Sequence, residues 1–489
     1  MLFNSAQFLI FFPIVTALYF LLPHRLRWIL LLTASCYFYM AFRPIYILIL
    51  AFTILVDYCA GIWIEDAPAG RRKLYLIASI VANVGVLAFF KYFNFLNGTG
   101  RSLATALGSS YPIPFLDIVL PIGLSFHTFQ SLSYTIEVYR GNYRAERNPG
   151  IFALYVMFYP QLVAGPIERP QNLLHEFHRE HFFDYTRVVA GLQLMLWGFF
   201  QKVFIADRLA PFVNTVYNDA HHYQGISFLI ATVFFAFQIY CDFSGYTDIA
   251  LGAAQVMGFY LMRNFNRPYF SQSIAEFWTR WHISLSTWFR DYFYIPLGGN
   301  RVSRPRWYFN LFFTFLISGL WHGANWTYVI WGAVNGLYLI AEIVARNWSA
   351  RLFHRPATPP AGFLPGAMLR TFCLTCFAWI FFRANSLRDA TYIVRNLFTG
   401  LTALPRQLHQ VAFVKGAILL GQDKQDFALA LLGIAILLGV HILQSNVHLG
   451  EVFARQRIGL RWGVYYAALI LILFFGAFNQ SQQFIYFQF

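Results

Sequence analysis

Charged residues are scarce in this sequence, because Asp, Glu, Lys and Arg together make up only 12% of its 489 residues. Soluble domains usually carry about 25% charged residues. Hydrophobic residues reach 58%, aromatic residues 20%, and the mean hydropathy is +0.51. A water-soluble chain of this composition could not cover its surface with polar groups. The composition therefore excludes an ordinary soluble protein and predicts an integral membrane protein with lipid as its solvent.

No polar stretch is long enough to form a separate soluble domain, and we find no internal repeat. A helix that crosses a bilayer needs about 20 apolar residues, so the chain has room for about 11–12 transmembrane helices. We therefore predict an all-α, polytopic fold in a single transmembrane domain, 1–489. Apolar runs lie near 3–22, 28–43, 45–64, 74–93, 116–137, 151–165, 188–206, 226–241, 307–321, 325–345, 367–382, 427–444 and 463–479. Between about 166 and 306 the pattern does not define the topology.

The net charge of +15 does not indicate a nucleic-acid partner, because apolar runs separate the basic residues. The loops at 25–27, 71–73 and 140–147 are basic, whereas those near 44 and 97–114 are poor in charge. Cytoplasmic loops of membrane proteins are enriched in Lys and Arg. This pattern places the N-terminus and the C-terminal tail outside the cytoplasm. The run 2–22 lacks a basic n-region, so we expect a retained helix and no cleaved signal.

Motifs of several common enzyme classes are absent. The chain has no G-x-S-x-G, no P-loop and no G-x-G-x-x-G, which argues against a hydrolase, an ATP-driven pump and a dinucleotide enzyme. His175, His178 and His181 are three residues apart and do not form H-E-x-x-H, so we predict no zinc. We also expect no bound cofactor. Cys373 and Cys376 lie in an apolar run, where packing is the expected role.

The stretch 277–301 reads F-W-T-R-W-H-I-S-L-S-T-W-F-R-D-Y-F-Y-I-P-L-G-G-N-R, which is too polar for lipid and too aromatic for a common loop. Irregular backbone at membrane depth is tolerated only where protein buries it or where it lines a wet cavity. A re-entrant segment fits this pattern. An amphipathic helix in the membrane interface fits it equally well.

Two histidines are candidates for acid–base chemistry. His322 lies between two apolar runs in L-I-S-G-L-W-H-G-A-N-W, and the flanking glycines would allow a ligand to approach closely. A neutral imidazole there could accept a proton from an attacking hydroxyl. His282, 40 positions earlier, could orient an acyl donor or polarise its carbonyl. The alternatives are a hydrogen-bonded core histidine for His322 and an interfacial histidine for His282.

Two further features concern an acidic residue and the end of the chain. Asp242, within an apolar region, needs a partner, and Arg280 or Arg290 would supply one in a structural ion pair. The chain ends in F-I-Y-F-Q-F, although termini usually fray into water. This tail could fold back into a groove of the protein, which would bring the hydroxyl of Tyr486 inside, or it could anchor at the membrane interface.

The 277–301 stretch, the W-H-G-A-N around His322 and the closing F-I-Y-F-Q-F together resemble motifs of the membrane-bound O-acyltransferase (MBOAT) family. More narrowly, the chain looks like the bacterial branch with the alginate O-acetylation membrane protein and its cellulose and peptidoglycan relatives. The matching blocks are M-L-F-N-S-A-Q-F-L, P-I-G-L-S-F-H-T-F, Q-L-V-A-G-P-I-E-R-P, D-F-S-G-Y-T-D-I-A, N-F-N-R-P-Y, the 277–301 stretch, W-H-G-A-N and the closing F-I-Y-F-Q-F. They run nearly from end to end. The loops near 98–112 and 404–426 match no motif of the family.

The resemblance implies a ring of helices and re-entrant segments around a central tunnel. His322 falls on the family's catalytic histidine, and His282 on its second motif position. Tyr486 matches a C-terminal motif that is thought to accept an acyl group in a related D-alanylation system, so it is a candidate acyl relay. Residues expected to support the tunnel are Trp281, Ser284, Arg290, Asp291, Trp321, Asp242 and Asn325.

The function implied by the resemblance is passage of an acetyl group from acetyl-CoA across the bacterial inner membrane, for O-acetylation of alginate, cellulose or a similar polysaccharide. The expected partners are a periplasmic acetyltransferase of the serine-hydrolase type and the polysaccharide synthesis machinery. A transporter of acylated intermediates is the alternative from another class. Acylation of lipid, peptidoglycan or protein is the alternative within the enzyme class.

Overall fold

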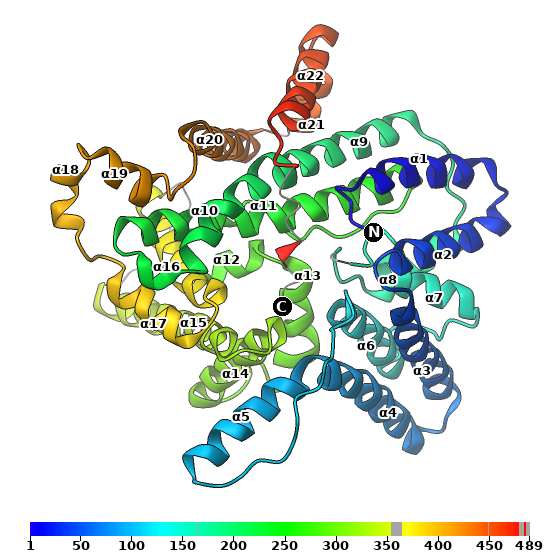
Figure 1. Ribbon diagram of the computed structural model, residues 1–489. Helices are drawn as coiled ribbons and strands as arrows, with labels where there is room; N and C mark the ends of the chain where they lie inside the picture. The colour runs from blue at the N-terminus through cyan, green and yellow to red at the C-terminus, as the bar shows by residue number, and fades with distance from the viewer. Residues whose placement is uncertain (164, 354–363, 448, 479–483, 486–489) are drawn as a thin grey trace. The chain divides into compact units, whose positions relative to one another are not determined.

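The computed structural model describes residues 1–489 apart from 164, 354–363, 448, 479–483 and 486–489. Every regular element in the described part of the chain is a helix, which confirms the predicted all-α class (Figure 1). The chain divides into two compact units. The first comprises Met1–Met195 and Thr247–Arg263, and the second comprises Leu196–Tyr246 and Asn264–Phe489.

The first unit is built from N-terminal helices. They are α1 (Ala6–Leu21), α2 (His24–Met40), α3 (Ile47–Asp66), α4 (Ala69–Leu87), α5 (Phe93–Ala106), α6 (Leu124–Arg140), α7 (Pro149–Met157), α8 (Pro170–Leu173) and most of α9 (Tyr185–Phe199). A buried polar contact ties α3 to α4, because Ser79 and Asn83 both donate hydrogen bonds to Asp57, at 2.6 and 2.8 Å. A carboxylate inside a helical bundle needs such donors to offset its lost hydration.

The second unit holds both candidate histidines. Its helices are α10 (Asp207–Tyr217), most of α11 (Ile226–Met257), α12 (Ile274–Arg280), α13 (Ile283–Phe289), α14 (Arg304–His322), α15 (Trp326–Phe353), α16 (Pro365–Arg383), α17 (Leu387–Asn396), α18 (Leu404–Gln407), α19 (Val411–Phe413), α20 (Lys424–Asn446), α21 (Leu449–Ala454) and α22 (Ile458–Phe475). A π-helical turn, η4 (Phe200–Ala206), joins α9 to α10. The core of this unit is rich in aromatic side chains, among them Trp281, Trp331 and Trp379.

Eight helices in the described residues are long and apolar enough to cross a membrane, and the shorter α1 is also apolar. Four expected spans correspond to helices that fall short in length or hydropathy, namely α2, α6, α7 and α14. The expected span at 116–137 begins later in the structure, and proline explains this shorter helix. Pro112, Pro114 and Pro121 keep the chain out of helix until α6 begins at Leu124, since proline lacks the amide N–H that a helix interior requires.

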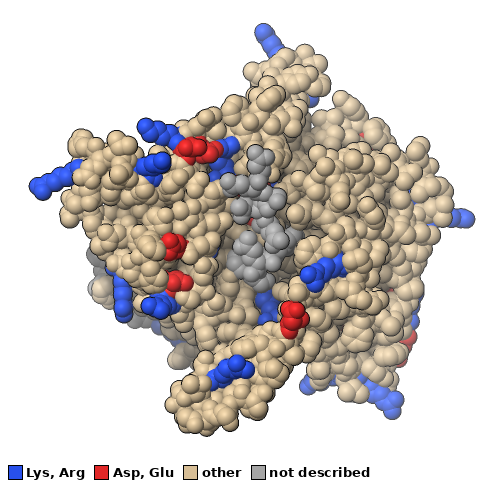
Figure 2. Space-filling model, in the orientation of Figure 1, with Lys and Arg blue, Asp and Glu red and all other residues tan. Residues whose placement is uncertain are grey.

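Apolar side chains are abundant on the surface. Along α22, Leu473 and Phe474 are 65% and 78% exposed, and only 6% of that helix is buried within the described protein. Charged side chains are sparse on the face shown in Figure 2. Apolar surface of this extent marks contact with an apolar solvent. The protein is therefore a multi-pass membrane protein, with the lipid bilayer as the partner that covers these helices.

Candidate active site

His322 is the last residue of α14, where two glycines permit an unusually close helix pair. Helices α14 and α15 lie side by side (Figure 1). A Cβ at Gly319 would lie 2.3 Å from the carbonyl oxygen of Tyr328, and one at Gly332 would lie 2.3 Å from that of Phe315. Small residues at helix crossings allow backbones in membranes to approach in this way. The crossing fixes the end of α14 and therefore the position of His322.

Gly323 completes the support for His322. Its backbone is extended, and a Cβ there would lie 2.1 Å from the ring of Tyr328. Asn325 begins the next helix, because its Oδ1 accepts a hydrogen bond from the amide of Thr327 at 3.0 Å. The W-H-G-A-N motif therefore combines a helix end, a position restricted to glycine and a helix cap within five residues.

The imidazole of His322 is buried in an aromatic enclosure. Its ring centroid lies 5.0 Å from that of Trp331 and 5.5 Å from that of Phe382, both in edge-on geometry. Trp331 also stacks on Trp379, with centroids 5.8 Å apart. Such walls exclude water, which would otherwise hydrolyse an activated acyl group.

His282 lies at a break between two short helices. Helix α12 ends at Arg280 and α13 begins at Ile283, and His282 itself has left-handed backbone angles of φ 43° and ψ 55°. Residues other than glycine adopt this conformation rarely, and it is often found at functional sites. Trp281 and His282 are both almost fully buried. Burial in protein is the condition for irregular backbone at membrane depth, and it disfavours an exposed interfacial helix for 277–301.

Asn264 holds the break in place. Its carbonyl accepts from the amide of Ile283 at 2.9 Å, and its Oδ1 accepts from the hydroxyl of Ser284 at 2.6 Å. Asn264 and Ser284 are both buried. A hydrogen-bonded pair of this kind restrains the first turn of α13 and, with it, His282. The N-F-N-R-P-Y block is therefore a structural support for the histidine.

The two histidines come together in the second unit. The ring centroids of His282 and His322 lie 6.5 Å apart, so both rings can contact one substrate group. His282 is only 2% exposed, and burial disfavours the charged form of an imidazole. A neutral imidazole carries one N–H donor and one acceptor, which suits it to orient or polarise a substrate oxygen.

The predicted arginine partner of Asp242 is wrong. Arg280 pairs with Glu276 on its own helix, and Arg290 pairs with its neighbour Asp291. Asp242 instead accepts a hydrogen bond from Lys202 at 2.6 Å, and the same ammonium group contacts Asp207 at 2.7 Å. The expectation of a structural ion pair is confirmed, with a lysine in place of an arginine.

A cavity of about 280 Å³ opens beside α14. Its lining includes Trp278, Leu285, Phe289, Arg290, Phe315 and Ser318. Ser318 precedes His322 by four residues, so both lie on the same face of α14. The cavity is mainly apolar, and Arg290 brings the only cation among its lining residues.

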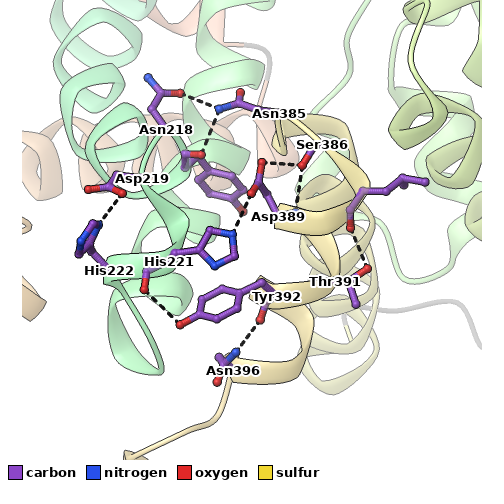
Figure 3. A network of polar contacts seen from close by, with 12 residues as sticks. Asn218, Asp219, His221, His222, Asn385, Ser386, Asp389, Thr391, Tyr392 and Asn396 are labelled. Carbon is purple, nitrogen blue, oxygen red and sulfur yellow. Dashed lines mark hydrogen bonds and ion pairs between the residues drawn. The ribbon is translucent and has the colours of Figure 1, made fainter. Parts of the chain in front are cut away.

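A polar cluster supports the other side of the W-H-G-A-N loop. The side chain of Asn325 donates to the carbonyl of Asn385 at 3.3 Å, and Asn385 donates to Asn218 at 3.4 Å. Figure 3 shows how this cluster continues from Asn385 to Ser386 and Asp389, and from Asp389 to His221. Asn325 therefore supports the loop that follows His322 through its side-chain hydrogen bonds.

The remaining predicted residues have varied positions. Ser284, two residues after His282, is buried, whereas Trp321 is only partly buried. Asp291 and Arg290 form an exposed pair near the cavity. Tyr486 lies outside the described residues. Sequence reasoning missed Lys202, although a lone lysine in the apolar run 188–206 was a signal for a buried partner.

Comparisons with known proteins agree with this architecture. The family model for membrane-bound O-acyltransferases matches residues 148–381. The probable alginate O-acetylase AlgI of Pseudomonas aeruginosa is 42% identical over 404 residues, covering 82% of this chain and 75% of the relative. That of Pseudomonas putida is 38% identical over 505 residues, covering 100% of each chain.

A relative that acts on another polymer also matches. The peptidoglycan O-acetyltransferase of Helicobacter pylori is 34% identical over 434 residues, covering 81% of this chain and 80% of the relative. The matches are long, and the matched family model includes His282 and His322. The chain belongs to the membrane-bound O-acyltransferase family and is an O-acyltransferase.

Proposed function

We propose that this enzyme takes an acetyl group from acetyl-CoA at the cytoplasmic face of the bacterial inner membrane and passes it outward for O-acetylation of a cell-surface or secreted polysaccharide. The meeting of His282 and His322 in one buried, aromatic enclosure is the observation that carries this proposal. The names of the relatives support an acetyl group and a glycan acceptor pathway, since they acetylate alginate or peptidoglycan.

The cavity beside α14 is the proposed donor site. Its volume of about 280 Å³ suits a slender acyl-bearing arm, and its apolar lining favours the thioester end. Arg290, at 60% side-chain exposure, can pair with a phosphate of the donor. The thioester then points along the face of α14 toward His322.

The proposed reaction is transfer between a thioester and a hydroxyl. His322 accepts the proton of the acceptor hydroxyl as its oxygen attacks the acetyl carbonyl carbon. The new C–O bond forms, the C–S bond breaks, and His322 returns the proton to the departing thiolate to give free CoA. The neutral His282 donates a hydrogen bond to the oxyanion of the tetrahedral intermediate.

The proposed acceptor enters from the side opposite the donor. Two hydroxyls are candidates, that of Tyr486 in the tail and a serine of a periplasmic acetyltransferase of the serine-hydrolase type. The N-terminus and the tail are proposed to face the periplasm, on the basis of the basic loops. The polysaccharide synthesis machinery would then use the acetylated partner.

A test of this function uses purified protein in nanodiscs with acetyl-CoA labelled in the acetyl group. We expect release of free CoA and label on the protein or on an added acetyltransferase partner. Succinyl-CoA, whose acyl group would carry a free carboxylate into the apolar cavity, serves as the matched donor control and should react poorly. Absence of CoA release from wild type with the partner present would refute the proposed donor.

A further inference from the structure

The carboxylate of Asp242 binds two donors from distant parts of the chain. Its Oδ1 accepts from Nζ of Lys202 at 2.6 Å, and its Oδ2 accepts from the amide N–H of Ile485 at 2.7 Å. The side chain of Asp242 is 3% exposed, and Ile485 is also buried. The tail residue therefore supplies half of the hydrogen bonding of a buried charge.

Lys202 fixes the direction of that carboxylate. It is itself buried and is held by a second acid, Asp207, at 2.7 Å. The backbones of α11 and η4 lie close together here, since a Cβ at Gly245 would be 2.9 Å from the amide nitrogen of Lys202. Because Oδ1 accepts the hydrogen bond from Lys202, Oδ2 is the oxygen that accepts from the tail. A buried carboxylate oxygen without a donor is costly, so docking of Ile485 is favoured.

The next residue of α11 links the docked tail to the histidines. The ring of Phe243 lies 5.8 Å from that of Phe484 and 4.6 Å from that of His282. Phe484 also packs on Tyr246, with centroids 4.7 Å apart. Asp242 and Phe243 thus hold consecutive residues of the tail, and Phe243 is in contact with a histidine of the candidate site.

We propose that Asp242 is a positioning residue that anchors Phe484 and Ile485 beside the histidine pair, with Lys202 orienting its carboxylate. The effect on catalysis rests on the proposed acetyl transfer, whereas the anchoring does not. The anchor limits where the end of the chain can lie relative to His282 and His322. It acts on the reaction through the tail and does not touch the donor.

Hydrogen–deuterium exchange of the C-terminal peptide tests the anchor without any need for activity. In Asp242→Asn the amide has one acceptor oxygen, which Lys202 holds, so the NH₂ group faces the N–H of Ile485. We expect exchange in this peptide to accelerate by about 10- to 100-fold, because a hydrogen bond to a charged group is lost. Unchanged exchange in folded Asp242→Asn would overturn the proposal.

Asp207→Asn is the matched control for the buried charge. It removes one of the two negative charges that Lys202 contacts and leaves both hydrogen bonds of Asp242 in place. Exchange of the tail should therefore remain close to that of wild type. Equal acceleration in both variants would show a general loosening of the helices and would overturn the role of Asp242 as a specific anchor.

A second pair of variants acts on the tail itself. Ile485→Pro removes the N–H donor without changing Asp242, and Ile485→Ala keeps it. We expect acetyl transfer by Ile485→Pro to show a lower kcat with an unchanged KM for the donor, and Ile485→Ala to retain more of the rate. Equal activity of the two variants would overturn the positioning role even if Asp242→Asn does not fold.

The exchange and activity measurements separate two failures. If wild type transfers no acetyl group while the exchange pattern is as expected, the proposed function fails and the anchor stands. If wild type is active but Asp242→Asn frees the tail without lowering kcat, the proposed function stands and the positioning role fails.

Discussion

The imidazole rings of His282 and His322 lie with centroids 6.5 Å apart, although 40 positions of the sequence separate them. The position of each ring depends on a different local structural feature. His322 is placed by a glycine-lined crossing of α14 and α15, and His282 is placed by a left-handed residue between α12 and α13. Substitutions that disturb these two features should therefore lower the rate of acetyl transfer even though both histidines are present.

Gly319→Ala tests the crossing of α14 and α15. The added Cβ would lie 2.3 Å from the carbonyl oxygen of Tyr328, so the two helices must move apart. We expect a lower melting temperature and slower acetyl transfer. Gly439→Ala is the control, since nothing lies within 4 Å of its Cβ position in α20. This replacement should stabilise by about 0.4–1 kcal/mol, and equal behaviour of the two variants would contradict the crossing as a constraint.

Asn264→Ala tests the support of the chain break at His282. The hydroxyl and amide of Ser284 would both lose their acceptor, which costs about 1–3 kcal/mol for buried groups. We expect a reduced rate of transfer together with a lower melting temperature. Ser284→Ala removes one donor and leaves Asn264 bound to the backbone, so its effects should be smaller. A reversed order of the two variants in thermal unfolding and kinetics would refute this assignment.

Glu168 in the first unit gives a prediction about pH. Burial raises the pKa of Glu168 to about 7 despite hydrogen bonds from Met262 and Asn172. The folded protein therefore binds more protons than the unfolded chain between about pH 4.5 and 7. The contribution of this group to stability falls as pH rises through that window, by at most about 3 kcal/mol, and is constant above it.

Glu168→Gln keeps an acceptor for the amide of Met262 and cannot ionise. We expect the variant to lose this fall in stability, so that its melting temperature exceeds that of wild type more at pH 8 than at pH 5. Glu180→Gln, at an exposed site, should follow wild type. A wild-type slope that persists in Glu168→Gln would show that another group titrates.

Tyr486 is the candidate relay of the tail. If its hydroxyl accepts the acetyl group, Tyr486→Phe should abolish labelling of the protein while His322 is intact. Tyr466→Phe, on the exposed face of α22, is the control and should be labelled as wild type is. The readout is intact mass after reaction with acetyl-CoA. Full labelling of Tyr486→Phe would show that another residue of this chain accepts the acetyl group and would contradict the relay.

Much of the fold and of the site could be predicted from the sequence. Composition predicted a helical membrane protein, and the family motifs identified His322 and His282 as candidates. The break at His282 could not be predicted, because the local sequence fits a continuous helix as well, and the left-handed residue is fixed by Asn264 from another segment.

The partner of Asp242 was missed for a related reason. Arg280 and Arg290 lie in the polar 277–301 stretch and were the expected cations, but each pairs with an acidic residue on its own segment. Lys202 reaches Asp242 because Gly245 lets η4 and α11 pack closely. Such pairing depends on helix packing, which a single sequence does not encode in any local pattern.

The most direct test of acid–base catalysis by His322 compares His322→Ala with wild type in a single-turnover assay with labelled acetyl-CoA. General acid–base catalysis is worth about 10²–10⁴-fold, so we predict a loss of that size in a variant that still folds. His222→Ala, at an exposed histidine paired with Asp219, is the control and should transfer at the wild-type rate. Transfer at the wild-type rate by folded His322→Ala would contradict the account.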